Sequence, residues 1–272
     1  MPPIPWPFDW TVYGGLAVFS LDYVLLCRGR DWRPRLGVFF ALGVLTLWVA
    51  LETPIDTISD RYLMSVHMVQ HVLLLFVAPP LLLLGLSPRM ARALASIPGV
   101  RPLTEPIPAQ VLAAAVMVFW HLPAPYDWTL RSEGLHVVEH LTFIAAGVIF
   151  WWPALTATSA ASKHQLGDGW KLLYLFIGTI PQDTVALPLL LSHVTFYGFY
   201  DQAPRLLDGL TPSVDQDIAG AVMMVVAKIT ILAALIVIFF RWVRSDLAAA
   251  EQVSGDRQAG RPARPASSGP PA

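Results

Sequence analysis

The sequence predicts an all-α membrane protein, a bundle of about seven transmembrane helices with its N-terminus outside and its C-terminus in the cytoplasm. Composition is the first indication: apolar residues make up 55% of the 272 residues and charged residues 14%, against roughly 25% charged residues in soluble domains. The mean hydropathy is +0.56. The second indication is that apolar runs approaching the ~20 residues needed to cross a bilayer recur along the chain. Because the formal net charge is −1, we expect no nucleic-acid partner.

Seven apolar stretches are the candidate spans, and we expect them to form one transmembrane domain over residues 10–244. Residues 1–9 precede it as an extracytoplasmic segment. Residues 245–272 are rich in Ala, Pro, Gly and Ser, so they are expected to form a disordered cytoplasmic tail. The candidate spans are Trp10–Cys27, Leu36–Leu51, Tyr62–Leu86, Ile107–His121, Leu135–Pro153, Trp170–Val194 and Ile218–Val243.

The predicted orientation comes from the cations in the loops. Lysines and arginines gather in alternate loops, and the loops between those carry mostly aspartate and glutamate. Cytoplasmic loops of membrane proteins carry the excess of cations, so the cation-rich loops are expected to be cytoplasmic. The cations that set this pattern are Arg28, Arg30, Arg33, Arg35, Arg89, Arg92, Arg101, Lys163, Lys171, Arg241 and Arg244.

The third span begins with a row of metal-ligating side chains. Met64, His67, Met68 and His71 are spaced i, i+3, i+4 and i+7, so on a helix they share one face. With the predicted orientation, this row lies in the outer half of the membrane.

Six of the seven histidines fall at this outer level, on four predicted helices. His67 with His71 and His136 with His140 are i, i+4 pairs, a spacing that lets two imidazoles bind one metal ion. His121 ends the fourth span and His193 closes the sixth. Buried polar residues in a membrane bundle need partners, so we expect these histidines to meet in a metal site.

The kinds of ligand indicate the metal. Imidazole with thioether and without thiolate suits copper, and methionine favours Cu(I); zinc, held by histidine and carboxylate, is the alternative. Glu139 is a candidate outer partner: its carboxylate would fix the tautomer of a metal-binding imidazole without binding the metal itself. Cys27 is the only cysteine, so neither a disulfide framework nor a thiolate metal site is expected.

Two acids lie within or beside predicted spans. Asp183 follows Pro181 and Gln182 in the sixth span, where the proline is expected to open the helix locally. Asp217 opens the seventh span. A carboxylate inside a membrane is a functional candidate, and a paired structural acid is the alternative for both positions.

Several motifs in this order resemble the CtaG-type cytochrome c oxidase assembly factor family. They are HMVQH with APPLLLLG downstream, WHLPAPYDW, HVVEHLTFIAAGVIFWWP, PQD, and DQDIAG before Met223. The resemblance implies a multi-pass protein of the bacterial plasma membrane, a metallochaperone that helps copper reach an oxidase subunit. It also implies that the histidine pairs are the family's metal-handling residues and that His121, Asp183 and Asp217 occupy its other polar positions. Ala221 and Met224 depart from the family pattern, which leaves the seventh span's part in the site open.

Other functions remain as alternatives. Histidines from facing helices are also haem ligands, which would make the chain a membrane haem or redox protein. Asp183 in mid-membrane would suit a copper or proton transporter. HVVEH fits an HxxEH zinc-peptidase pattern, although we expect the protein not to be an enzyme. The lipid bilayer and an oxidase subunit are the expected partners, and a homo-oligomer is left open.

Overall fold

The computed structural model describes residues 4–27, 31–155, 158, 160 and 162–258. Within these residues the protein is helical and contains no strand. Five helical segments are long and apolar enough to cross a membrane, and the bent pair α8 (Pro106–Trp120) and α9 (Pro123–Thr129) would make a sixth. These five segments are Pro34–Leu51, Met64–Leu84, Glu133–Trp151, Asp168–Leu191 and Pro212–Gln252.

Each of the seven predicted spans therefore coincides with a helix, but not every helix has the length of a span. The first, α1 (Trp10–Leu26), has 17 residues, which is about 25 Å of helix against a hydrocarbon core of about 30 Å. The count of seven spans and the outside position of the N-terminus stay predictions.

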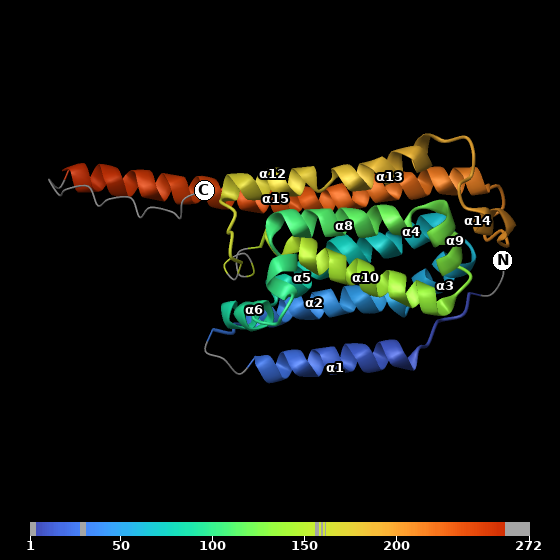
Figure 1. The fold of residues 1–272 in the computed structure, drawn as a ribbon, viewed down its shortest axis with the longest axis horizontal. Coiled ribbons are helices and arrows are strands. Elements are labelled where there is room, and N and C mark those ends of the chain that lie inside the picture. Colours follow the sequence, from blue (N-terminus) through green and yellow to red (C-terminus); the bar gives the residue numbers. More distant parts are fainter. Residues whose placement is uncertain (1–3, 28–30, 156–157, 159, 161, 259–272) are drawn as a thin grey trace.

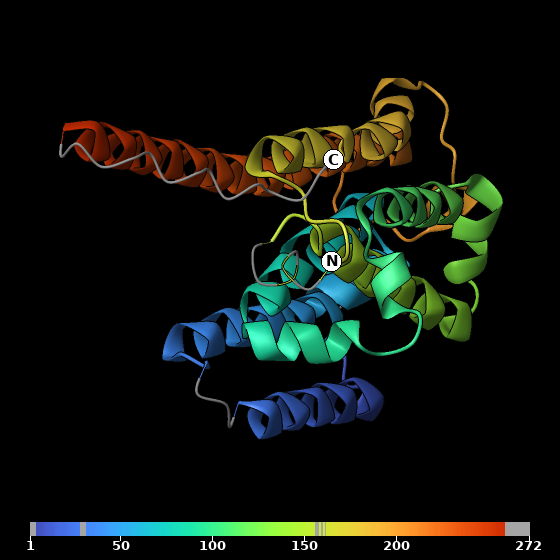
Figure 2. The same cartoon turned by 60° about the vertical axis from the view of Figure 1, so that its left-hand side comes forward.

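The long helices run side by side along one axis, and α1 lies at the edge of the bundle in both views (Figures 1 and 2), where its Tyr23 stacks on Phe40 of the next helix. The long helix α15 (Pro212–Gln258) packs against α13 (Ile180–Leu191) and α4 (Met64–Val72). Helix α2 (Pro34–Leu51) packs against α5 (Ala78–Leu84), and α10 (Glu133–Trp151) packs against α8. The short helices α3 (Pro54–Arg61), α9 and α14 (Gly198–Gln202) gather at one end of the bundle (Figure 1).

The third span is one continuous helix with a π-helical turn in its middle. The turn, η1 (Leu73–Val77), precedes Pro79 and Pro80, which lie inside α5. Proline has no N–H to donate and its ring crowds the carbonyl of residue i−4, and a wider π turn accommodates both effects. The prolines thus distort the helix one turn earlier than their own positions.

Gly147 of α10 lets that helix approach the π turn closely. A Cβ atom at Gly147 would lie 2.5 Å from the Leu75 carbonyl oxygen and 2.5 Å from Pro79 Cγ. We expect Gly147→Ala to lower the free energy of unfolding by about 1–3 kcal/mol, since the backbones must separate. Gly134→Ala, in the first turn of the same helix with no atom within 4 Å of the new Cβ, is the control and should not destabilise. Thermal unfolding in detergent measures both; equal melting temperatures would contradict the prediction.

The fourth span ends in a sharp bend, and the sixth span is interrupted. The axes of α8 and α9 differ by 75°, and the bend lies at His121-Leu122-Pro123. In the sixth span, α12 (Asp168–Ile177) ends before Gly178 and Thr179, and α13 begins with Pro181 in its first turn. This break confirms the expected effect of Pro181.

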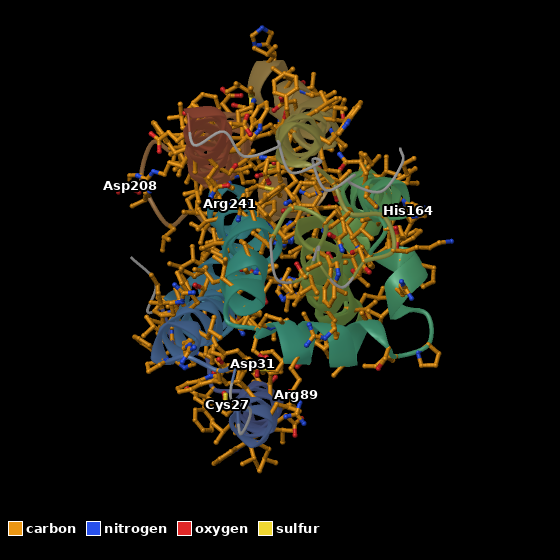
Figure 3. All side chains as sticks on the ribbon, turned by 90° about the vertical axis from the view of Figure 1, so that its left-hand side faces the viewer. Cys27, Asp31, Arg89, His164, Asp208 and Arg241 are labelled. Atoms are coloured by element: carbon orange, nitrogen blue, oxygen red, sulfur yellow. The ribbon has the colours of Figure 1, made fainter. Side chains whose placement is uncertain are left out.

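Short helices and polar contacts hold the end of the bundle opposite to α3 and α14. Two helices, α6 (Pro88–Ala95) and α7 (Val100–Leu103), follow the third span. The Arg89 amide donates to Asp31 at 3.0 Å, and these two residues lie together in Figure 3. Asp168, at the start of α12, accepts from Lys171 at 3.1 Å and from Arg241 of α15 at 3.0 Å.

The last helix extends further than the sequence predicts. A disordered tail is expected from residue 245, whereas α15 continues to Gln258 and projects beyond the bundle (Figure 1). Asp246–Gln252 reads DLAAAEQ and contains neither proline nor glycine, so local propensity favours helix there. Residues 259–272 lie outside the described part of the chain.

Candidate metal centre

Five histidines from three helices meet inside the bundle: His67 and His71 of α4, His121 at the end of α8, and His136 and His140 of α10. All five are buried, none of them more than 8% exposed. The ring centroids of His67 and His71 are 4.2 Å apart, and those of His136 and His140 are 4.1 Å apart. The two pairs adjoin through His67 and His136, at 5.3 Å, and His121 lies 5.4 Å from His71. We call these five residues the histidine cluster.

The proton positions on His67 follow from its neighbours. Burial holds the pKa of Tyr200 well above its usual range, so its hydroxyl keeps its proton. That proton is donated to the Ser59 carbonyl at 2.7 Å. The Tyr200 oxygen therefore accepts from His67 Nδ1, 3.0 Å away, and the Nε2 atom of neutral His67 carries a lone pair. Its nearest partner is His71 Nε2, at 2.7 Å.

Two more histidines are oriented in the same way. His121 Nδ1 lies 2.7 Å from the Met117 carbonyl, so it carries the proton and leaves the lone pair on Nε2. His136 Nδ1 faces the Asp60 carboxylate at 3.5 Å. The Nε2 atoms of His121, His136 and His140 are buried without a hydrogen-bond partner. Metal-bound histidines commonly donate the second ring N–H to a carbonyl or carboxylate, and the cluster has that arrangement.

Glu139 contributes a carboxylate from α10. It is fully buried, and neither of its oxygens has a hydrogen-bond partner. Oε1 lies 3.6 Å from His71 Nε2, and Oε2 lies 4.0 Å from His136 Nε2. Two groups of three residues bring their ligand atoms within 4.8 Å of one another. The first is His67, His136 and His140, and the second is His67, His71 and Glu139. Glu139 therefore belongs to a group that could hold a metal ion, whereas the sequence predicts it as a partner outside the metal shell.

Thioethers are present on the same helix as the first histidine pair. Met64 and Met68 of α4 are buried, at 2% and 0% exposure, within the hydrophobic core. They share the helix face predicted for them, and packing accounts for their burial. Cys27 is the C-cap of α1, the helix at the edge of the bundle (Figure 1).

Three other predicted site residues lie apart from the candidate ligand groups. Helix α13 ends at Leu191 and the backbone becomes extended at Ser192, so His193 leaves the helical register and is exposed. Asp217 is half-buried in α15, while Asp215, two residues earlier, is the acid whose carboxylate is buried and hydrogen-bonded. Asp183 of α13 pairs with Lys228 of α15, with 2.6 Å between Oδ1 and Nζ.

The pair of Asp183 and Lys228 yields a stability prediction. Both side chains are partly exposed on the outside of the bundle, at 27% and 41%. Asp183→Leu leaves an ammonium without its counter-charge in an apolar segment, and we expect it to cost about 1–3 kcal/mol. Asp183→Leu combined with Lys228→Leu should recover most of this loss, because the unpaired charge is then absent. Unfolding in detergent measures both variants, and a double variant no more stable than the single one would contradict the prediction.

Several residues that support the cluster are missing from the sequence interpretation. Tyr200 of α14 orients His67 and is itself held by the Ser59 carbonyl, and Asp60 of α3 faces His136. Gln70, fully buried in α4, donates to the Ala50 carbonyl at 2.9 Å and to Asp56 at 2.8 Å. Tyr200, Ser59 and Asp60 are polar residues between apolar spans, a property that many loop residues share; Gln70 stands inside the HMVQH motif, but the motif does not show what it contacts.

Comparison with known proteins agrees with the motifs. The family model described as cytochrome c oxidase caa3 assembly factor (Caa3_CtaG) matches residues 17–245. The match covers every histidine of the cluster. No curated protein and no solved structure matches the chain.

Proposed function

The chain belongs to the cytochrome c oxidase caa3 assembly factor family, and from that premise we propose that it binds copper in the histidine cluster and delivers it to an oxidase subunit. Several apolar helices make it a multi-pass membrane protein, and its family role implies contact with the oxidase. The observation that carries the proposal is the group of His67, His136 and His140, whose ligand atoms lie within 4.8 Å of one another, with no hydrogen-bond partner on Nε2 of the last two. An ion bound there would satisfy them together.

The distances support one ion held by atoms from two helices. Two nitrogens bound to one tetrahedral ion at 2.0–2.1 Å lie about 3.3 Å apart. The 2.7 Å between His67 Nε2 and His71 Nε2 needs to widen by about 0.6 Å, which small side-chain rotations supply. His67 belongs to both candidate groups, so an ion could exchange between them without leaving His67. Exchange of this kind is what a delivery protein requires.

The ligand chemistry favours copper over zinc. The cluster offers neutral imidazoles with thioethers on the same helix and no thiolate, a combination that suits copper. Glu139 makes zinc the second candidate, because zinc also accepts histidine with carboxylate. A haem fits less well, since the rings of the two pairs already lie 4.1–5.3 Å from one another. A macrocycle would have to separate α4 from α10.

Transport across the membrane is the weaker alternative. The expected pathway residue Asp183 is paired with Lys228 on the outer surface of the bundle. The cluster instead contacts α3, α9 and α14, because His67 meets Tyr126 and Tyr200 and His136 faces Asp60; these three helices lie at one end of the bundle (Figure 1). Ligands concentrated at one end suit delivery at one face.

A transfer experiment tests the proposal. The purified protein, loaded with copper and reconstituted in vesicles, is mixed with a copper-free oxidase subunit beside a copper chelator. We expect the subunit to acquire copper faster than from the chelated metal alone, and His71→Ala to remove this advantage while His193→Ala keeps it. Acquisition no faster than from chelated copper would refute delivery.

A further inference from the structure

A polar cleft of about 560 Å³ reaches the histidine cluster from the end of the bundle that carries α3, α9 and α14. His136 and His140 line it. Each is at least nine-tenths buried, with an Nε2 atom that has no hydrogen-bond partner. The cleft therefore connects water at this end of the bundle with two unsatisfied ligand groups. Its lining comes from α3, from the end of α9, from the start of α10 and from the N-terminal segment; Figure 1 shows α3 and α9 at this end of the bundle.

The charges along this cleft favour a cation. Four carboxylate residues and two arginines line it: Asp9, Asp56, Asp60, Glu133, Arg61 and Arg131. The carboxylates outnumber the arginines, which also line a neighbouring recess beside Phe199. Burial, followed by the charge of Asp60, raises the pKa of Asp56 to about 7. Near neutral pH Asp56 is therefore partly protonated, and the negative charge of the cleft rests mainly on Asp9, Asp60 and Glu133.

Asp60 lies between water and the histidines. Its side chain is 34% exposed, and Oδ2 is 3.5 Å from Nδ1 of His136, whose side chain is 10% exposed. Ser59 Oγ, 3.0 Å from Oδ1, is a hydrogen-bond donor for the carboxylate. On the far side of the same imidazole, Nε2 is buried without a hydrogen-bond partner, and His136 belongs to the group formed with His67 and His140. The imidazole ring of His136 therefore separates the Asp60 carboxylate from the candidate metal group of His67, His136 and His140.

We propose that this cleft is the loading route, in which the Asp60 carboxylate receives a hydrated divalent cation and passes it to His136 and His140. The inference rests on the proposed function, because it concerns how the same cluster is filled. A carboxylate at a water boundary holds a hydrated cation through oxygen, and imidazoles then replace the remaining waters. An acidic cleft with low-dielectric walls raises the association rate of a cation by about 10-fold or more.

The test separates the rate of loading from the capacity for metal. Stopped-flow mixing of the metal-free full-length protein with Cu²⁺ measures the association rate in wild type, Asp60→Asn, Asp60→Glu and Asp208→Asn. Asp208 is exposed and does not line the cleft (Figure 3), so its substitution is the matched loss of charge. We expect Asp60→Asn to load at least about 10-fold more slowly with the same final stoichiometry, while Asp60→Glu and Asp208→Asn stay close to wild type.

The wild type alone supplies a second measurement if Asp60→Asn does not fold. Its association rate should fall steeply as ionic strength rises, because salt screens the acidic cleft. A rate independent of salt, or equal rates for Asp60→Asn and Asp208→Asn, would overturn the loading route and leave the proposed function standing. Absence of copper binding by the wild type would refute the proposed function itself.

Discussion

Replacement of His67 by alanine is expected to lower the affinity of the protein for copper by more than about 100-fold. His67 is shared by both groups of ligand atoms, so its loss leaves neither group complete. Loss of a residue that only orients a ligand costs about 10–100-fold in affinity, and loss of a shared ligand should exceed that. Competition with a chelator of known affinity measures the change.

The control for His67→Ala is His193→Ala. Both remove one imidazole, but His193 is exposed and lies outside both candidate metal groups. We expect the control to bind copper as the wild type does. If His67→Ala bound copper with wild-type affinity, or if His193→Ala weakened binding equally, the metal would lie elsewhere.

Asp215→Ala is expected to lower the free energy of unfolding by about 2–4 kcal/mol. The Asp215 carboxylate accepts from the Met64 amide at 2.7 Å, the Ser65 amide at 3.3 Å and the Ser65 hydroxyl at 2.5 Å. Leu63, at the N-cap of α4, supplies no side-chain cap, so an acid from α15 satisfies this helix end. Hydrogen bonds to a charged group contribute about 1.5–3 kcal/mol each, and removing the acceptor leaves buried donors unpaired.

Asp217→Ala is the matched control for Asp215→Ala. It removes a carboxylate from the same first turns of α15, at a half-buried position for which the structure shows no hydrogen bond or ion pair. Thermal unfolding in detergent should show a large decrease in melting temperature for Asp215→Ala and a small one for Asp217→Ala. Similar decreases in melting temperature for the two variants would mean that the Asp215 cap of α4 contributes little to stability.

The part of the site that could be predicted from the sequence is the part carried by regular helices. The i, i+4 pairs His67 with His71 and His136 with His140 keep their spacing because α4 and α10 are unbroken where the pairs lie. His121 marks the end of α8 as expected. His193 was placed by extending the sixth span to Val194, but the helix stops at Leu191. An error of three residues at a helix end was enough to move this imidazole out of the cluster.

The supporting residues could not be predicted because they act across long separations in sequence. Tyr200 meets His67 from 133 residues away, and Asp215 caps α4 from 151 residues away. Neither contact leaves a periodic pattern. Lys228 lies in an otherwise apolar stretch of α15, and only its distance to Asp183 shows that the intramembrane acid has a structural partner.

X-ray absorption at the copper edge of the purified, copper-loaded protein tests the central claim most directly. With copper in the histidine cluster, the spectrum should show nitrogen or oxygen scatterers at about 2.0 Å together with the multiple scattering of imidazole rings. His67→Ala should remove a large part of that imidazole signal. A copper shell without imidazole, or an imidazole signal that His67→Ala leaves unchanged, would contradict binding at this cluster.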